Sequence, residues 1–216
     1  MIHILSEKNS IFNQYIAELR DTEIQKDSMR FRRNLERMGE IMAYELSKTL
    51  EYTSKQTTTP LGIAETKHLK TEPVIATILR AGLPMHVGVL NYFDKAQNAF
   101  ISAYRRYHKD NSFDIHVEYV SSPNLDDKIL ILCDPMIATG NSIVLSYKAI
   151  LSKGTPKHVH IISAIGSKEG IDFVKQNMPT KNYTIWCGAV DEELTAHSYI
   201  VPGLGDAGDL AFGEKI

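Results

Sequence analysis

The stretch ILILCDPMIATGNS, residues 129–142, decides the fold that we expect for this chain. It begins with a run of isoleucine and leucine, which is typical of a strand buried on both faces of a sheet. The run ends at Asp134, a turn follows as far as Gly140, and a helical pattern begins at Asn141 and Ser142. The stretch therefore predicts a buried strand, a tight loop and a helix start, the repeating unit of a parallel α/β sheet.

The expected helix start is also a candidate anion-binding site. Backbone N–H groups in the first turn of a helix have no partner within the helix, and the helix dipole places partial positive charge there. The hydroxyls of Thr139 and Ser142 add donors. We therefore expect a phosphate carried by a sugar, with the Asp134 carboxylate accepting from ribose hydroxyls. The alternative is an ordinary strand, turn and helix without a ligand.

Strand and helix patterns alternate along the rest of the chain. Apolar strand-like runs lie at residues 74–79, 98–103, 115–120, 159–164 and 183–187, and helical patterns lie at 29–52, 85–92, 143–151 and 168–177. This alternation predicts an α/β fold with a mostly parallel twisted sheet and helices on both faces. No repeat or linker divides the chain, so we expect one domain over residues 1–216. Because ligands bind at the carboxyl ends of strands in such sheets, the chemistry should gather after Leu79, Ala103 and Cys133.

The composition restricts the kind of protein. A formal net charge of −2 leaves no basic field for nucleic acid. No apolar run approaches the length of a membrane span, and the first residues lack the apolar centre of a signal peptide. The two cysteines, Cys133 and Cys187, lie in apolar runs and are expected to be buried free thiols of a reducing compartment. We therefore expect a cytoplasmic protein that binds neither nucleic acid nor membrane.

Two basic segments are further candidates. Arg80 follows the strand-like run at 74–79 and precedes a small-residue turn, where backbone N–H groups can approach an anion. The alternative is a surface arginine at a strand end. Residues 104–109, YRRYHK, are basic and aromatic. They suit a mobile arm that closes over a polyanion, and they suit a solvated charged hairpin equally well.

The segment GLGDAG, residues 203–208, has the glycine spacing of a dinucleotide-binding motif. That motif needs a second strand with an acid about twenty residues later, and only eight residues follow Gly208. The small residues instead predict a loop that recognises a small flat ligand through backbone amides. His158 and His160 alternate along a strand-like run, and we favour a partly exposed strand face over a metal pair, since no third ligand lies nearby.

Together these segments resemble the uracil phosphoribosyltransferase family. The matching pieces, which occur in the family's order, are ILRAG at residues 78–82, YR at 104–105, the loop at 134–142 and YIVPGLGDAGD at 199–209. The C-terminal piece is specific to this branch of the wider fold. The resemblance implies a type I phosphoribosyltransferase-like α/β fold, with a flexible hairpin arm at about 104–120 and a uracil-binding hood at about 188–216.

The resemblance also implies a reaction. A pentosyl-transferring glycosyltransferase of this family converts uracil and 5-phospho-α-D-ribose 1-diphosphate (PRPP) to UMP and diphosphate in pyrimidine salvage. Mg²⁺ would be bound mainly through PRPP, without a metal site built by the chain alone. A homo-oligomer, either a dimer or a tetramer, and a nucleotide effector such as GTP would be expected. The alternative is a regulatory RNA-binding protein of the same fold that senses pyrimidine nucleotides.

By resemblance, individual residues take roles. The implied catalytic residues are Arg80, Arg105, Asp134 and Asp206. The implied PRPP contacts are Arg80, Arg105, Asp134, Pro135, Met136, Ile137, Ala138, Thr139, Gly140, Asn141, Ser142 and Asp206. The implied uracil contacts, chiefly through main-chain atoms, are Tyr199, Ile200, Gly205, Asp206 and Ala207. The chain departs from the family pattern at Asn141, where glycine is expected, and at Leu210-Ala211, which replaces an arginine-containing pair.

Overall fold

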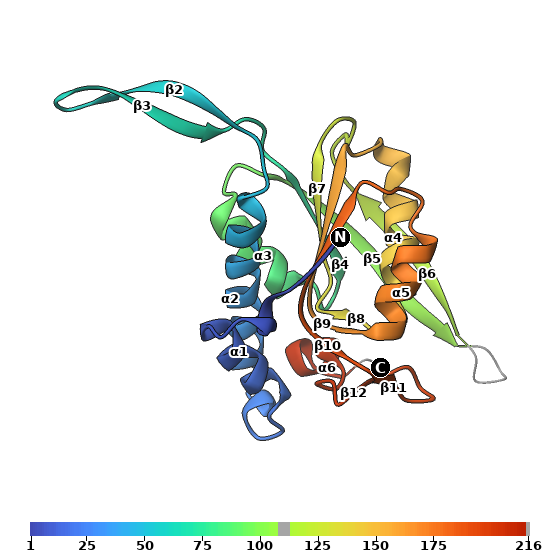
Figure 1. Cartoon of the computed structure of the whole chain (residues 1–216). Coiled ribbons are helices and arrows are strands. Elements are labelled where there is room, and N and C mark those ends of the chain that lie inside the picture. Colours follow the sequence, from blue (N-terminus) through green and yellow to red (C-terminus); the bar gives the residue numbers. More distant parts are fainter. Residues whose placement is uncertain (108–112, 215–216) are drawn as a thin grey trace.

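One large sheet forms the centre of the structure (Figure 1). We describe residues 1–107 and 113–214 of a computed structural model, with residues 103–107 and 113–117 described by their backbone only. In order across the sheet, the strands are β1 (Ile2–Ile4), β10 (Tyr183–Asp191), β9 (His158–Ser167), β7 (Ile129–Cys133), β4 (Val74–Leu79), β5 (Gln97–Tyr107) and β6 (Phe113–Ser121). Every pairing along this order is parallel except that of β5 with β6. The expected mostly parallel sheet is confirmed.

Helices cover both faces of the sheet, as the sequence predicts. They are α1 (Ile11–Arg20), α2 (Ser28–Ser47), α3 (Leu83–Tyr92), α4 (Asn141–Ile150), α5 (Lys168–Asn177) and α6 (Ala207–Phe212), with 3-10 turns at Leu5–Glu7, Ile24–Lys26 and Leu151–Lys153. Figure 1 shows α1, α2 and α3 on one face and α4 and α5 on the other. Across the described ranges, no helix has both the length and the apolar character needed to cross a bilayer.

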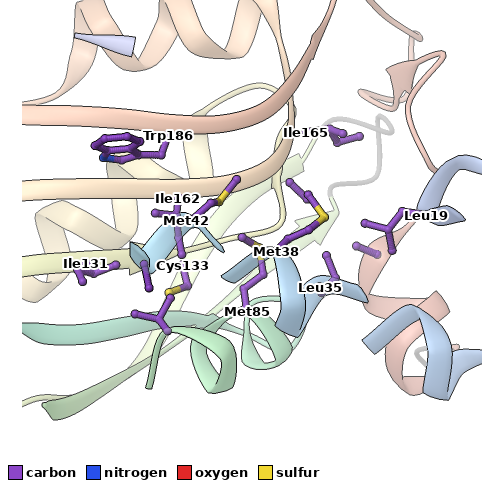
Figure 2. Close-up of a cluster of buried hydrophobic side chains, with 14 of the residues drawn as sticks. Leu19, Leu35, Met38, Met42, Met85, Ile131, Cys133, Ile162, Ile165 and Trp186 are labelled. Carbon is purple, nitrogen blue, oxygen red and sulfur yellow. The ribbon is translucent and has the colours of Figure 1, made fainter. Parts of the chain in front are cut away.

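Strand β7 shows why the central strand is continuously apolar. Ile131 and Cys133 belong to the core cluster that includes residues of α2 and α3, whereas Leu130 and Leu132 belong to the cluster that includes residues of α4. All four side chains are fully buried. Successive strand residues face opposite sides of a sheet, and here helices cover both sides. Figure 2 shows Ile131, Cys133 and Trp186 within the first of these clusters.

Both cysteines are buried free thiols, as expected from the sequence. Cys133 belongs to one core cluster and Cys187 to the other, so the sheet lies between them. Burial raises the pKa of both thiols, that of Cys187 to about 12. Neither cysteine is therefore a candidate nucleophile.

The sequence does not predict the hairpin formed by β2 (Tyr52–Thr59) and β3 (Gly62–Leu69). The helix expected over residues 29–52 ends at Ser47, and β2 begins five residues later. Threonines in β2 favour a strand, but the hairpin is largely exposed, so no apolar alternation marks it in the sequence. The hairpin projects away from the sheet and helices in Figure 1.

Three strands continue several residues further than the sequence predicts, and β9 is one of them, since it continues beyond Ala164 to Ser167. β10 continues beyond Cys187 to Asp191, and β5 continues to Tyr107. The flexible arm expected at 104–120 is thus partly an antiparallel ladder of β5 with β6, because backbone pairing overrides the polar composition. Residues 108–112 of the expected arm lie outside the described residues.

Candidate active site

The loop after β7 is the first part of the candidate site. β7 ends at Cys133, and α4 begins at Asn141 after Gly140, which has a left-handed backbone with φ of 78°. Glycine adopts this conformation without steric cost. The backbone and side-chain amides of Asn141 donate to the Thr139 hydroxyl over 3.4 and 3.3 Å. The Asn141 side chain, at a position where the resemblance led us to expect glycine, therefore folds back onto the loop.

The strand β9 and the start of α5 both pack against this loop. The strand β8 (Met136–Ile137) pairs with β9, and the Ser167 hydroxyl donates to the Ala138 carbonyl over 2.5 Å while accepting from Gly170 N over 2.8 Å. A Cβ at Gly170 would lie 2.1 Å from that carbonyl, so only glycine lets α5 approach so closely. Ser167 is not among the site residues predicted from the sequence. Its one signal is a serine directly before a helical pattern, the position of an N-cap.

Asp134 lies at the carboxyl end of β7, where the sequence places it. Its backbone N–H donates to the Ile162 carbonyl over 3.2 Å, and its carboxylate accepts from Met136 N over 3.5 Å. The residue is only 8% exposed. Burial raises the pKa of its carboxyl from an ordinary 3.8 to about 7. A small pH change or a hydrogen-bonding ligand can therefore switch the charge of this group near neutral pH.

Arg80 lies in the turn between β4 and α3, beside the loop after β7. A Cβ at Gly82 would lie 2.5 Å from the Cys133 carbonyl, so this turn packs directly against the end of β7. The Leu79–Arg80 peptide bond is cis. The Arg80 side chain is 40% exposed, and its guanidinium donates to the Asp209 carboxylate over 3.2 Å and to the Gly213 carbonyl over 3.0 Å. Arg80 therefore reaches from the sheet to the C-terminal segment.

The C-terminal segment forms a hood beyond the same end of the sheet. The short strands β11 (Glu193–Leu194) and β12 (Ile200–Val201) pair antiparallel, and α6 follows (Figure 1). Ile200 and Ala207 are buried, Gly205 is exposed with φ of 93°, and Tyr199 is 43% exposed. Since the side chains of Ile200 and Ala207 point into the core, their backbone atoms are what they can offer to a ligand.

Asp206 begins α6 as its N-cap. Its carboxylate accepts from Gly208 N over 2.8 Å and from Asp209 N over 3.0 Å, which satisfies donors at the helix start. The far end of α6 is held by Arg32, which donates to the Ala211 carbonyl over 2.6 Å. Asp206 therefore fixes the geometry of the hood in this structure, a role that the sequence did not indicate.

The sheet brings the candidate segments together. β4 lies between β5 and β7, so the segments after these three strands are neighbours. Arg105 lies within β5, where its backbone pairs opposite Ile115 of β6. The Arg105 side chain falls outside the described part of the chain. Asp134, the loop after it, Arg80 and the hood thus share one end of the sheet.

A cavity of about 350 Å³ lies at the opposite end of the sheet, and none of the candidate residues lines it. Its wall includes Ile129 and His158, the first residues of β7 and β9, and also His160. The expected partly exposed strand face is wrong for His160, which is 4% exposed and accepts from Trp186 Nε1 over 3.0 Å. Burial lowers the pKa of His160 to about 4. The position of the candidate site therefore follows from its loops and not from this cavity.

A sequence model of one family, described as uracil phosphoribosyltransferase, matches residues 6–214. The chain belongs to the uracil phosphoribosyltransferase family. A relative of that name from Porphyromonas gingivalis is 55% identical over 216 residues, which cover 100% of this chain and 99% of the relative. Another from Methanothermobacter thermautotrophicus is 39% identical over 190 residues, covering 87% of this chain and 86% of the relative.

Solved structures agree with this assignment at the level of the fold. The AQ2163 protein of Aquifex aeolicus has a TM-score of 0.86 at 29% identity, over 99% of this chain and 98% of that one. An adenine phosphoribosyltransferase of Trypanosoma brucei, solved with AMP, pyrophosphate and ribose-5-phosphate, has a TM-score of 0.56 at 11% identity, over 95% of this chain and 88% of that one. That identity supports a shared fold alone.

Membership of the uracil phosphoribosyltransferase family confirms the resemblance drawn from the sequence. The chain is an enzyme of the pentosyltransferase class, and this interpretation is supported over the regulatory RNA-binding alternative. The family matches at nearly full length, so the hood and the loop after β7 both lie within the matched residues.

Proposed function

We propose that this member of the uracil phosphoribosyltransferase family transfers the phosphoribosyl group of PRPP to N1 of uracil, giving UMP and diphosphate in pyrimidine salvage. The observation that carries the proposal is the convergence of three parts at one end of the sheet. These parts are the loop after Asp134, the turn at Arg80 and the glycine-rich hood. Such a site offers an anion-binding helix start, a cation and a backbone-lined loop at one end of the sheet.

The 5′-phosphate of PRPP is assigned to the helix start of α4. The backbone N–H groups from Ile137 to Ser142 and the hydroxyls of Thr139 and Ser142 supply the donors, and the helix dipole favours the anion. The Asp134 carboxylate would accept from the ribose hydroxyls. Burial raises the pKa of this carboxyl to about 7, and hydrogen bonds from the ribose hydroxyls would favour its ionised form.

The diphosphate is assigned to Arg80 and Arg105. Arg80 already holds two oxygen acceptors of the C-terminal segment, so the diphosphate would take over donors that are set in place. Among the described residues, no cluster of three or more acidic, histidine or cysteine side chains could hold a metal ion. We propose that PRPP oxygens hold Mg²⁺, with at most one or two carboxylates, such as Asp134 or Asp206. When bound, Mg²⁺ would neutralise charge on the departing diphosphate.

Uracil is assigned to the hood, through main-chain atoms of Tyr199, Ile200, Gly205 and Ala207, with Asp206 beside them. Uracil offers a donor at N3 and an acceptor at O4, and cytosine reverses both. A backbone carbonyl facing N3 and an N–H facing O4 would leave cytosine with unmatched buried groups. Each such mismatch costs about 1–3 kcal/mol.

We also propose a cytoplasmic homo-oligomer, a dimer or tetramer, in which residues 1–216 form one domain. The projecting β2–β3 hairpin supports the oligomer, since its tip exposes Leu61 fully and Ile63 by 71% and a second copy could cover it. A nucleotide effector such as GTP rests on the family resemblance alone.

The test is an assay of UMP formation from uracil and PRPP with Mg²⁺, with orotate, cytosine and hypoxanthine as competing bases. We expect uracil to give UMP and the other three bases to give no nucleotide product. Separation of nucleotide from free base detects the product. Comparable product from orotate or hypoxanthine, or none from uracil, would contradict the proposal.

A further inference from the structure

A partly buried ion pair links the N-terminal helix α1 to the hood. Both terminal nitrogens of the Arg20 guanidinium donate to the Asp191 carboxylate, each over 2.8 Å. One of these nitrogens also donates to the Gly203 carbonyl over 2.9 Å, and Gly203 N donates back to the Asp191 carboxylate over 3.0 Å. The pair therefore engages both the N–H and the C=O of one residue in the middle of the hood loop.

The two charged residues are carried by rigid elements. Arg20 is the last residue of α1, and Asp191 is the last residue of β10. α1 packs closely on β10 beside Gly188, because a Cβ there would lie 2.9 Å from Ile16 and 3.0 Å from Phe12. This close contact at Gly188, three residues before Asp191, fixes how α1 lies along β10. The end of α1 that carries Arg20 therefore lies in a fixed place beside the end of β10.

The residue that the pair holds sits between the proposed uracil contacts. Gly203 is buried, has φ of 58°, and lies three residues after Ile200 and two before Gly205. A Cβ at Gly203 would lie 2.0 Å from the Ile200 carbonyl, so the loop doubles back on itself there. Any displacement of Gly203 would move the backbone atoms on both sides of it.

The charge and partial burial of Arg20 and Asp191 strengthen the hydrogen bonds between them. The Asp191 side chain is 8% exposed and the Arg20 side chain is 22% exposed. Bidentate charge-assisted hydrogen bonds are shorter and stronger than neutral ones, and the planar guanidinium fits a carboxylate in one geometry. A partly buried pair of this kind is weak evidence for stability, but it specifies position well.

We propose that Arg20 and Asp191 are positioning residues that set the affinity for uracil by fixing Gly203. Both residues act through the loop backbone and neither touches the base. Recognition through main-chain atoms cannot adjust by side-chain rotation, so the loop must be placed accurately before uracil arrives. The inference rests on the proposed function, because it concerns the same hood.

The test measures both Michaelis constants in the UMP-forming assay for the full-length enzyme. The variants are Arg20→Ala, Arg20→Lys and Asp191→Asn. Asp191→Asn keeps the shape and an acceptor for Gly203 N, and Arg20→Lys keeps the charge without the planar fork. Arg30→Ala is the matched control, because it removes another arginine of this region, one that is 50% exposed and pairs with Glu18 over 3.1 Å.

We expect Arg20→Ala and Asp191→Asn to raise the KM for uracil on the order of 10-fold to 100-fold, with the KM for PRPP changed by less than about 2-fold. Arg20→Lys should recover part of the loss, since an ammonium can still reach either acceptor. Arg30→Ala should leave both constants unchanged. If Arg20→Ala fails to fold, Asp191→Asn still tests the expected rise in the KM for uracil.

Two results would overturn the inference while leaving the proposed function standing. One is a wild-type enzyme that makes UMP while all three variants keep its KM for uracil. The other is an equal rise in both Michaelis constants accompanied by lower melting temperatures, which a merely structural pair would produce. A wild-type enzyme that makes no UMP would overturn the proposed function and this inference together.

Discussion

Replacing Asp134 by asparagine should make the enzyme more stable at alkaline pH while impairing its use of PRPP. Burial raises the carboxyl pKa from 3.8 to about 7 in the folded chain. The folded state binds this proton more tightly than the unfolded state does. The stabilisation that the protonated Asp134 contributes is therefore fully present below pH 4 and is lost as the pH rises through about 7. At roughly 1.36 kcal/mol per pKa unit, the ionised carboxylate costs the folded protein about 4 kcal/mol.

Most of this cost develops over an accessible pH range. Between pH 5 and pH 8.5 the linkage relation assigns about 3 kcal/mol to Asp134. The amide of the Asp134→Asn variant cannot ionise, so the variant should gain about 3 kcal/mol over the wild type between these two conditions. Urea unfolding of both proteins at each pH measures this difference. The matched control is Asp172→Asn, which neutralises a carboxylate that is 49% exposed on α5 and should gain nothing.

The same variant should have a higher KM for PRPP at neutral pH, because an amide accepts from ribose hydroxyls more weakly than a carboxylate does. Two outcomes would refute the reasoning. If Asp134→Asn and the wild type shared one pH dependence of unfolding, the carboxyl would not titrate near neutrality. If Asp134→Asn kept the wild-type KM for PRPP, the carboxylate would not hold the ribose.

The remaining predictions concern the same end of the sheet and the core behind it. Arg80→Ala should lower kcat/KM for PRPP on the order of 100-fold, with little change in melting temperature, because the side chain is 40% exposed; full turnover would refute its role. Ser167→Ala should lower the free energy of unfolding by about 1–3 kcal/mol, measured in urea, since it leaves the Ala138 carbonyl without its donor; Ser152→Ala, on an exposed hydroxyl, is its control. Neither Cys133 nor Cys187 should react with a thiol reagent below pH 9 in the folded protein, because burial raises the pKa of both thiols; rapid labelling without denaturant would contradict this.

The sequence predicts the elements whose signals are local. The strand Val74–Leu79 and the helix Lys168–Asn177 have the bounds that the sequence indicates. The strand is a continuous apolar run and the helix has apolar residues at helical spacing, and each has a clear boundary residue. The loop after β7 is predictable for the same reason, since an apolar run, an acid and a Thr-Gly turn are contiguous.

The parts that the sequence does not predict depend on distant partners. The β2–β3 hairpin is largely exposed on both sides, so it has no apolar face to produce a pattern. Arg20 and Asp191 are 171 residues apart, and no local spacing relates them. Similarly, His160 is buried because Trp186 packs and hydrogen-bonds with it from the next strand. In each case the tertiary environment, and not the local sequence, decides the structure.

Arg80 connects the two substrates in the proposed reaction. Its guanidinium binds Asp209 and the Gly213 carbonyl, both in the C-terminal segment that follows the uracil loop. The Arg80 and Asp209 side chains are 40% and 35% exposed, so this pair is worth about 1 kcal/mol or less. A diphosphate carries more charge than one carboxylate and can displace Asp209 at that small cost. If Arg80 meets the diphosphate as proposed, PRPP binding breaks the Arg80–Asp209 pair, while Arg32 and the buried Ala207 and Ala211 still hold α6. The hood therefore keeps its position for uracil after the phosphates are in place.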